Sequence, residues 1–368
     1  MQRNNAIDAV KGFAIVLVMV GHCIVLNGLD RTDPYLYDAI KSIQMPLFML
    51  VSGVLASYGV RKNGVGTGFQ KLPQRAVSYL VPFFSWFVLV HFYTHIKAGT
   101  LTVSGFGGEL KDLLFQTDRG LWFLMTLFTA TVCAMAAQTA ADKTAKSRAT
   151  KALIFVLISG CFYLLFFFQS RSGNTFLSPS LMLQYYPYYL TGYVVNGYLL
   201  KEEERMVSNN RREKIRVAEA FCVTVMLIAF VMMVIFMDLA VPVDGIKTLA
   251  CQMAASFLGT VSCFAIVYRL AERYQKKTEK RGFLSFVGLY TLEIYVLHFR
   301  FARLLGLSEK GLTLYSPEGI MWILLAFVVM SLFTAVAVWA ISRIPVVSLL
   351  LFGKHHVTVF SGRDVRRS

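Results

Sequence analysis

The chain has 368 residues, of which 56% are hydrophobic and 16% are charged. Soluble globular proteins contain about 45–50% apolar and about 25% charged residues, so the composition excludes an ordinary soluble enzyme or a disordered chain and favours a protein embedded in a bilayer. The formal net charge of +16 would indicate nucleic-acid binding in a soluble protein, but in a membrane protein it first reports which side the loops face.

Ten apolar segments are long enough to cross a hydrocarbon core of about 30 Å, which takes about 20 helical residues. Their apolar residues lie on most helical faces, unlike those of a soluble bundle. We therefore expect an all-α integral membrane protein, a bundle of about ten transmembrane helices. In chain order the segments are Ile7–Leu26, Ala39–Tyr58, Ser78–His95, Trp122–Ala141, Ala152–Phe168, Leu181–Leu200, Ala218–Met237, Thr248–Tyr268, Phe283–Leu305 and Ile320–Ile341.

Local sequence features predict the structure of the first two segments and of the region around the third. The first contains charged residues and has no small-residue cleavage site, so we expect a retained helix and not a signal peptide. Pro46 is expected to break the second segment, and the glycine-rich loop Ile96–Leu121 is expected to dip back or to form a rim over a site. His91 and His95, spaced i and i+4, are interpreted as interface histidines in preference to metal ligands.

Basic residues test the topology independently. Of the 37 lysines and arginines, 26 lie at the N-terminus, in alternate loops and at the C-terminus, and 7 lie in the other five loops. Because cytoplasmic loops are enriched in lysine and arginine, both termini are expected to be cytoplasmic.

We expect residues 1–342 to form a polytopic membrane domain and residues 343–368 a basic cytoplasmic tail. The basic loops interleave glutamates, which favours contact with anionic lipid over nucleic acid.

Four basic residues remain inside the spans, and they are Lys11, Lys41, Arg300 and Arg303. Asp8, Asp38 and Glu293 are acidic neighbours within the spans or at their edges. A charge at the bilayer centre costs about 2.5–3.5 kcal/mol, so these groups should face a polar interior. They either mark a site or form ion pairs that only order the packing, and the two arginines also have the length to snorkel to the surface.

Counting residues along each expected helix places several candidate residues at a similar depth in the outer half of the membrane. His22 follows Lys11 by 11 residues, about 16 Å along a helix, and His298 reaches a similar outer depth in the ninth segment. Lys41 and Gln44 enter from the outer side in the second segment. Histidines with charged neighbours are suited to proton transfer. Lys71 and Arg75, at the cytoplasmic side of the third segment, are suited to phosphate binding.

Four motifs follow one another along the chain: Asp8-Ala-Val-Lys11-Gly12 through Gly21-His22, Met45-Pro46-Leu47-Phe48 through Ser52-Gly53, Leu121-Trp122-Phe123-Leu124, and Leu292-Glu293 through His298. Together they resemble the motifs of the membrane-bound acyltransferase 3 family, in particular its sugar O-acetylase branch. The resemblance implies transfer of an acyl group, commonly acetyl from cytoplasmic acetyl-CoA, to a hydroxyl of an envelope glycan or glycolipid. It also implies a bacterial inner membrane, acyl-CoA as co-substrate, and neither a tightly bound cofactor nor a metal.

The resemblance assigns roles position by position. Lys11 and His22 correspond to the family's basic-x10-His pair, and Ser52-Gly53 to its second-helix element. Lys71 and Arg75 match the family's Arg-x-x-Arg loosely, being four residues apart. Gln44 stands where the sugar branch usually has histidine.

Two questions stay open at this stage. His22 acts either as the general base for the acceptor hydroxyl or as a covalent acyl carrier. Lys41, Gln44 and Trp122 are candidates for the acceptor entrance, with His298 assisting and with Asp8, Ser52 and Glu293 in support. On the residues alone, a multi-span transporter or flippase of a polar or glycolipid substrate is the competing function, in which the same charges relay protons or bind substrate.

Overall fold

The computed structural model describes residues 4–29, 35–66, 68–100, 102–117, 120–200, 209–237, 239, 246–306 and 312–354. All regular secondary structure in these ranges is helical. The chain divides into two compact units, and the boundary at Val51 and Ser52 falls inside a helix. Unit 1 comprises Met1–Val51, Glu203–Ala340 and Phe360–Ser368, and unit 2 comprises Ser52–Glu202 and Ile341–Val359.

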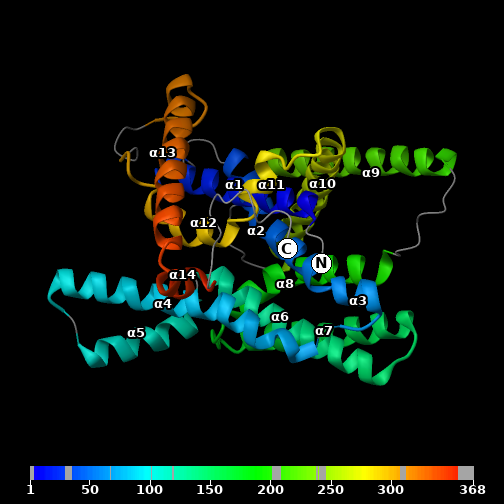
Figure 1. The fold of residues 1–368 in the computed structure, drawn as a ribbon, viewed down its shortest axis with the longest axis horizontal. Helices are drawn as coiled ribbons and strands as arrows, with labels where there is room; N and C mark the ends of the chain where they lie inside the picture. The colour runs from blue at the N-terminus through cyan, green and yellow to red at the C-terminus, as the bar shows by residue number, and fades with distance from the viewer. Residues whose placement is uncertain are drawn as a thin grey trace. The chain divides into compact units, whose positions relative to one another are not determined.

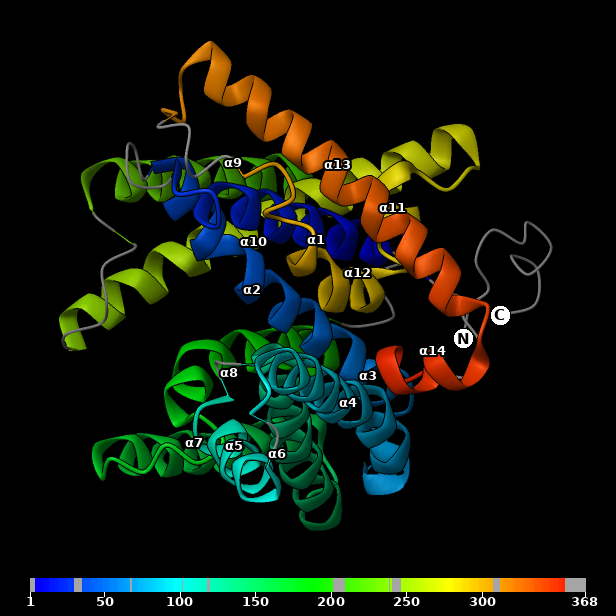
Figure 2. The ribbon, with the colours of Figure 1, turned by 90° about the vertical axis from the view of Figure 1, so that its left-hand side faces the viewer.

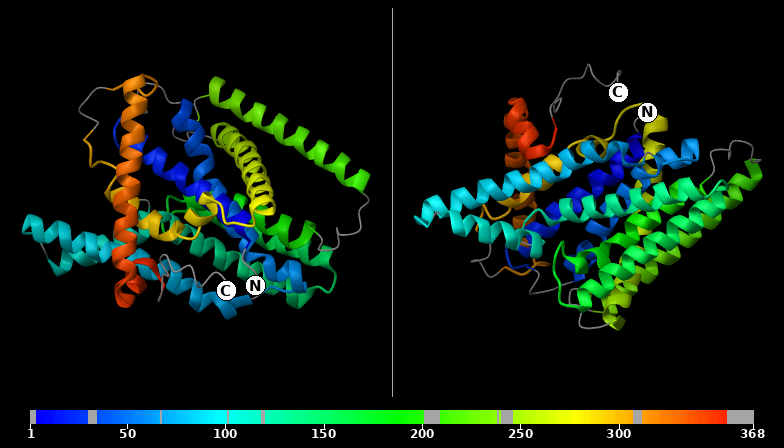
Figure 3. Two further views of the ribbon diagram at one scale, coloured as in Figure 1. Left: turned by 45° about the horizontal axis from the view of Figure 1, so that its top comes forward. Right: turned by 90° about the horizontal axis from the view of Figure 1, so that it is seen from below.

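Unit 1 is built around the first helix, which packs against α10 and α11, while α9 pairs with α10 (Figures 1 and 3). An apolar cluster that includes Met19, Ile24, Ala326 and Met330 forms a core between α1 and α13. The helices of unit 1 are α1 (Asn5–Val25), the first part of α2 (Tyr35–Ala56), α9 (Asn209–Phe236), α10 (Ile246–Thr278), α11 (Phe283–Val287), α12 (Thr291–Leu297), a 3₁₀ turn (His298–Arg300) and α13 (Pro317–Ser342).

Two glycines allow α1 and α11 to approach at backbone distance. A Cβ atom on Gly12 would overlap the carbonyl oxygen of Leu284, and one on Gly288 would overlap the carbonyl oxygen of Asp8. The Ser285 hydroxyl also donates a hydrogen bond of 2.8 Å to the Asn5 carbonyl. Small residues are the usual means of close helix contact where lipid removes the hydrophobic driving force. This contact sets where α11 and the following α12 lie on α1.

Unit 2 is a second helical group with α6 at its centre, packed against α4, α7 and α8 (Figure 2). The Trp86 indole donates a 3.1 Å hydrogen bond to the Leu351 carbonyl, which places α14 on α4. Its elements are α3 (Tyr58–Asn63), a 3₁₀ turn (Gly68–Lys71), α4 (Leu72–Ala98), α5 (Val103–Phe115), α6 (Trp122–Thr144), α7 (Arg148–Arg171), α8 (Pro179–Val194), a π-helical turn (Val195–Leu199) and α14 (Pro345–Phe352). Helix α14 thus occupies the start of the expected C-terminal tail.

Eight helices in the described residues are long and apolar enough to span a bilayer. Several present large apolar side chains outward, such as Phe168 on α7, Phe221 on α9 and Leu324 on α13, each at least 60% exposed. Such faces are unfavourable in water and suit lipid. The chain is therefore an integral membrane protein. The eight ranges are Asn5–Val25, Tyr35–Ala56, Gly68–Ala98, Trp122–Thr144, Arg148–Arg171, Ala218–Phe236, Lys247–Thr278 and Pro317–Ser342.

The other two expected spans are not single long helices. In place of Leu181–Leu200, α8 has 16 residues and passes into the π-helical turn. The span expected at Phe283–Leu305 is divided into α11, α12 and the 3₁₀ turn. Interrupted helices are tolerated at membrane depth where protein satisfies their backbone groups, and here the close approach at Gly288 holds the interruption against α1.

The expected break at Pro46 is wrong, because α2 continues through this residue from Tyr35 to Ala56. Proline removes one helical hydrogen bond, but the helix on either side is buried and held by packing. At Ser52-Gly53, α2 and α8 approach closely, since a Cβ on Gly53 would overlap the carbonyl oxygen of Tyr189 in α8.

Candidate functional site

The structure brings two histidines of unit 1 into ring contact. The imidazoles of His22 on α1 and His298 after α12 have centroids 5.2 Å apart with an interplanar angle of 41°. The Phe299 ring packs edge-on against His22 at 5.3 Å. His298 is 1% exposed, whereas His22 is partly exposed. The pair therefore combines a partly exposed histidine with one that is enclosed by protein.

The hydrogen bonds of these rings leave two nitrogen atoms available. His298 Nδ1 lies 2.8 Å from the Ile294 carbonyl oxygen, and a carbonyl only accepts, so Nδ1 carries the proton. In the neutral ring Nε2 then holds a lone pair. His298 Nε2 and His22 Nδ1 are both buried without a hydrogen-bond partner among the described residues. Buried polar atoms are seldom left unpaired, and an unpaired imidazole nitrogen is suited to receiving a proton from a substrate.

Two further predicted residues lie on elements that adjoin this pair: Glu293 precedes His298 in the chain, and Gln44 lies beside Gly21 in space. Glu293, on α12 and one and a half turns before His298, is fully buried. Gln44, on α2, lies beside Gly21, because a Cβ at Gly21 would be 3.0 Å from Gln44 Oε1. That oxygen is buried and has no hydrogen-bond partner in the described part of the chain. The amide is thus placed next to the residue that precedes His22.

Lys11 lies on the same face of α1 as His22, but at a different position along the helix axis. It forms a 3.4 Å ion pair with Asp8, and both side chains are largely buried. Eleven residues of helix rotate by about 20° beyond three full turns and rise about 16 Å. Lys11 therefore faces the same way as His22, but its side chain is too short to reach the imidazole. The two residues do not meet at one catalytic point.

The remaining acceptor-side candidates are divided between the two units. Lys41 is exposed and lies three residues before Gln44 on α2. Ser52 is partly buried next to the Gly53 contact in unit 2. Trp122 begins α6 in unit 2, where it stacks on Tyr185 with centroids 5.2 Å apart.

The two cations that are expected to bind phosphates, Lys71 and Arg75, line one pocket of unit 2. Lys71 ends the 3₁₀ turn and Arg75 lies in the first turn of α4, and both face this pocket together with Gln138, Tyr189 and Tyr193. The Arg75 guanidinium donates a 2.9 Å hydrogen bond to the Tyr79 hydroxyl. Lys71 and Arg75, four residues apart, thus both line this pocket. Two neighbouring cations in one pocket are suited to binding phosphate groups.

An ion pair holds the loop that leads to these cations. Lys151 on α7 lies 2.9 Å from Asp142 on α6 and donates a 2.8 Å hydrogen bond to the Gly64 carbonyl. Asp142 also accepts a 2.8 Å hydrogen bond from the Gly66 amide. The turn that follows α3 is thereby tied to α6 and α7, next to the segment that carries Lys71.

The sequence interpretation missed the polar inner wall of this pocket. Gln138 is 1% exposed, and its Oε1 accepts hydrogen bonds from the hydroxyls of Tyr193 and Tyr198 at 3.1 and 2.6 Å. Its Nε2 is buried and has no partner in the described ranges. The tyrosine-rich stretch 185–198 was the available signal, because buried tyrosines need a partner for each hydroxyl.

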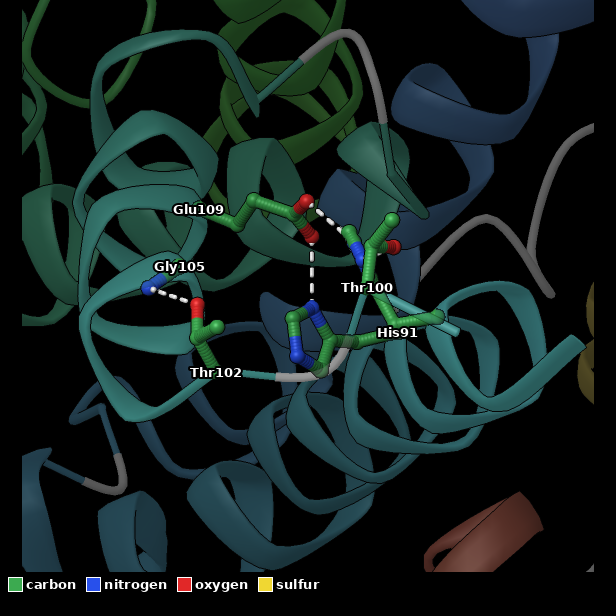
Figure 4. Close-up of polar contacts among 6 residues, drawn as sticks. His91, Thr100, Thr102, Gly105 and Glu109 are labelled. Atoms are coloured by element: carbon green, nitrogen blue, oxygen red, sulfur yellow. Dashed lines mark hydrogen bonds and ion pairs between the residues drawn. The ribbon is translucent and has the colours of Figure 1, made fainter. Parts of the chain in front are cut away.

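A second polar cluster lies away from these residues, between α4 and α5 of unit 2. Glu109 accepts hydrogen bonds of 2.7 Å from His91 Nδ1 and of 2.7 Å from His95 Nε2. Figure 4 shows the Glu109 carboxylate facing the His91 ring. The hydrogen bond from His91, and to a smaller extent that from His95, lowers the pKa of the Glu109 carboxyl below its usual value. Helix α5 lies within the segment Ile96–Leu121, which was expected to be a loop that dips back or forms a rim.

Comparison with known proteins shows similarity along nearly the whole chain. The Acyltransferase domain family, acyltransferase 3, matches residues 4–350. Nodulation protein NolL of Sinorhizobium fredii is 34% identical over 134 residues, and that of Mesorhizobium japonicum is 29% identical over 131 residues. These matches cover 35% and 34% of the present chain and the same shares of the relatives. The chain thus aligns with only about a third of the length of these relatives. No solved structure matches significantly.

Proposed function

Since the chain belongs to the acyltransferase 3 family, we propose that this acyltransferase moves an acyl group, in particular acetyl, from cytoplasmic acyl-CoA to a hydroxyl of an envelope or exported glycan. The family assignment favours acyl transfer over the transporter or flippase that the membrane charges alone left open. The contact between His22 and His298 is the observation that carries the proposal. It provides what ester formation from a hydroxyl needs at neutral pH, a base in a partly enclosed site.

The proposed step is attack of the glycan hydroxyl on the thioester carbonyl. A C–O bond forms, the C–S bond breaks, the hydroxyl proton passes to His22, and the CoA thiolate leaves and takes up a proton. His298 donates its Nδ1–H to the Ile294 carbonyl. Its Nε2 therefore keeps a lone pair that can accept a hydrogen bond within the site. The buried amide of Gln44 supports the acceptor, in the position where the sugar branch usually has histidine.

The donor is proposed to bind in the pocket of unit 2. Lys71 and Arg75 supply positive charge for the CoA phosphates, and Gln138 Nε2 supplies a buried donor for a carbonyl oxygen of the pantetheine arm. Binding from the cytoplasm is supported by the loop charges, because loops enriched in lysine and arginine, such as the one that carries Lys71 and Arg75, tend to be cytoplasmic. The resemblance to the acyltransferase 3 family supports a bacterial inner membrane as the location.

The function is tested with purified protein in lipid nanodiscs, given labelled acetyl-CoA and a glycan extract. We expect alkali-labile label on the glycan, together with stoichiometric release of free CoA thiol. Parallel reactions with longer acyl-CoA donors define the chain-length preference. Folded protein that forms no labelled ester with acetyl-CoA or with longer donors would refute the proposed reaction. NMR of envelope glycans from cells with and without the gene should show loss of O-acetyl signals.

Replacing Arg75 by glutamine is expected to raise the KM for acetyl-CoA by about 10–100-fold. The reason is that a hydrogen bond to a charged group contributes about 1.5–3 kcal/mol, and each 1.4 kcal/mol is a factor of ten. Lys71→Gln should act in the same direction, with less effect because Lys71 is exposed. Steady-state kinetics in nanodiscs provides the measurement.

Two controls make this test specific. Lys62→Gln removes an exposed cation of α3 and should leave KM unchanged. Acetylpantetheine lacks the nucleotide phosphates, so the Arg75 variant should use it as well as the unmodified protein does. An equal loss with acetylpantetheine would show that Arg75 does not bind phosphate.

A further inference from the structure

We propose that His91, His95 and Glu109 form a binding site for a divalent transition-metal ion, with zinc the ion that this donor set suits best. The three ligand atoms come from two helices and lie within 4.8 Å of one another. The proposal departs from the interpretation of the two histidines as interface residues, and it is independent of the proposed acyl transfer. The sequence did not reveal the third ligand, since Glu109 follows His95 by 14 residues.

The placement of the ligands follows from local structure. His91 and His95 are one turn apart on α4, so their rings lie on one face with centroids 4.4 Å apart. A left-handed Gly99 ends α4, and Thr102 caps α5 by accepting a hydrogen bond from the Gly105 amide (Figure 4). This short connection returns α5 along α4, with Glu109 opposite the two imidazoles.

The donor set and its spacing suit zinc. Two imidazoles and one carboxylate are a known three-ligand zinc set that leaves a fourth position for water. A zinc ion bound at about 2.0–2.1 Å holds tetrahedral ligand atoms about 3.3 Å apart, so the present spacing needs only side-chain rotation. Glu109 and His95 are 44% and 23% exposed, which gives them room to rotate and gives the ion a path from solvent.

The surroundings orient the two rings. His95 Nδ1 lies 2.8 Å from the Thr100 hydroxyl, which is the outer-shell contact that usually orients a metal-binding histidine. His91 is 3% exposed and contacts Phe87 and Phe106, with centroids 6.0 and 5.0 Å away. Direct hydrogen bonds to Glu109 already hold the three ligands together, and an ion would replace these bonds and link α5 to α4.

The test is metal binding by the full chain, purified with a tag that lacks histidine, reconstituted in nanodiscs and stripped with chelator. Calorimetric titration with zinc should give one site per chain, and cobalt should give the strong visible absorption of four-coordinate Co²⁺. Glu109→Gln and His95→Gln should each weaken zinc binding by more than about 100-fold, since even outer-shell partners contribute about 10–100-fold. Thr100→Val should weaken it by about tenfold.

Glu318→Gln is the matched control, because it removes a carboxylate from the first turn of α13 and should leave zinc affinity unchanged. Size-exclusion profiles establish that each variant is folded. Folded protein that binds less than stoichiometric zinc would overturn the proposal. Zinc binding that both ligand variants retain would overturn it equally, because the ion would then lie elsewhere.

Discussion

Replacing His22 by alanine is expected to reduce kcat for acyl transfer by about 10²–10⁴-fold, the usual contribution of a positioned general base. His22 is the more accessible member of the histidine pair, and its Nδ1 is buried without a partner in the described residues. Because the donor is proposed to bind at the pocket of unit 2, the KM for acetyl-CoA should change by less than about threefold. Steady-state kinetics with labelled donor measures both quantities.

Two comparisons separate the possible roles of His22. His22→Gln retains a polar side chain of similar size, so an equal loss of kcat indicates that the imidazole itself is required and not its packing. Incubation with labelled acetyl-CoA without acceptor, followed by a rapid quench, detects any acyl-His22 intermediate. His355→Ala, at a position outside the described residues, serves as the histidine control and should retain kcat. Unchanged turnover by His22→Ala would eliminate both roles.

The variant Gly12→Ala is expected to lower the free energy of unfolding by about 1–3 kcal/mol, the usual cost of overpacking. Its new methyl group would overlap the Leu284 carbonyl and push α11 away from α1. Because α11 leads into α12 and His298, the same change should displace His298 from His22 and lower kcat. Thermal unfolding by tryptophan fluorescence in nanodiscs and a parallel kinetic assay measure the two effects.

Gly160→Ala is the matched control, since Gly160 also lies inside a helix but a Cβ there meets no atom within 4 Å. Alanine has the higher helix propensity, so this variant should gain up to about 1 kcal/mol. The two variants share the same intrinsic propensity change, and the difference between them isolates the α1–α11 contact. Equal stabilisation by both would mean that Gly12 does not pack against α11.

Part of the site was predictable because its parts lie in local motifs. The spacing of Lys11 and His22 requires one face of a single helix, and a helix has a known rise and rotation per residue. The level of His298 followed from counting along the ninth apolar segment. Charge at the start of the third span likewise identified Lys71 and Arg75. Each of these inferences needs only one stretch of chain and its direction.

Other parts depended on contacts between distant segments. Gln138 is an ordinary polar residue near the end of α6 until Tyr193 and Tyr198 bond to its oxygen. The division of the ninth span was equally hidden, because an apolar run indicates burial without showing where the helix is interrupted. Gly288 marks the place only when the Asp8 backbone lies against it.

The sequence by itself determined that the chain is helical and lies in a membrane, since hydropathy summed over about 20 residues measures the cost of entering lipid. Its motifs also indicated the acyltransferase family, which the match over residues 4–350 shows. Only the tertiary structure decided the rotation of each helix, and with it the contact of His22 with His298 and of Glu109 with His91 and His95. The physical reason is that lipid-facing helices are apolar on most sides, so their own sequences specify depth well and rotation poorly. Rotation is set by close glycine contacts and by polar partners on other segments.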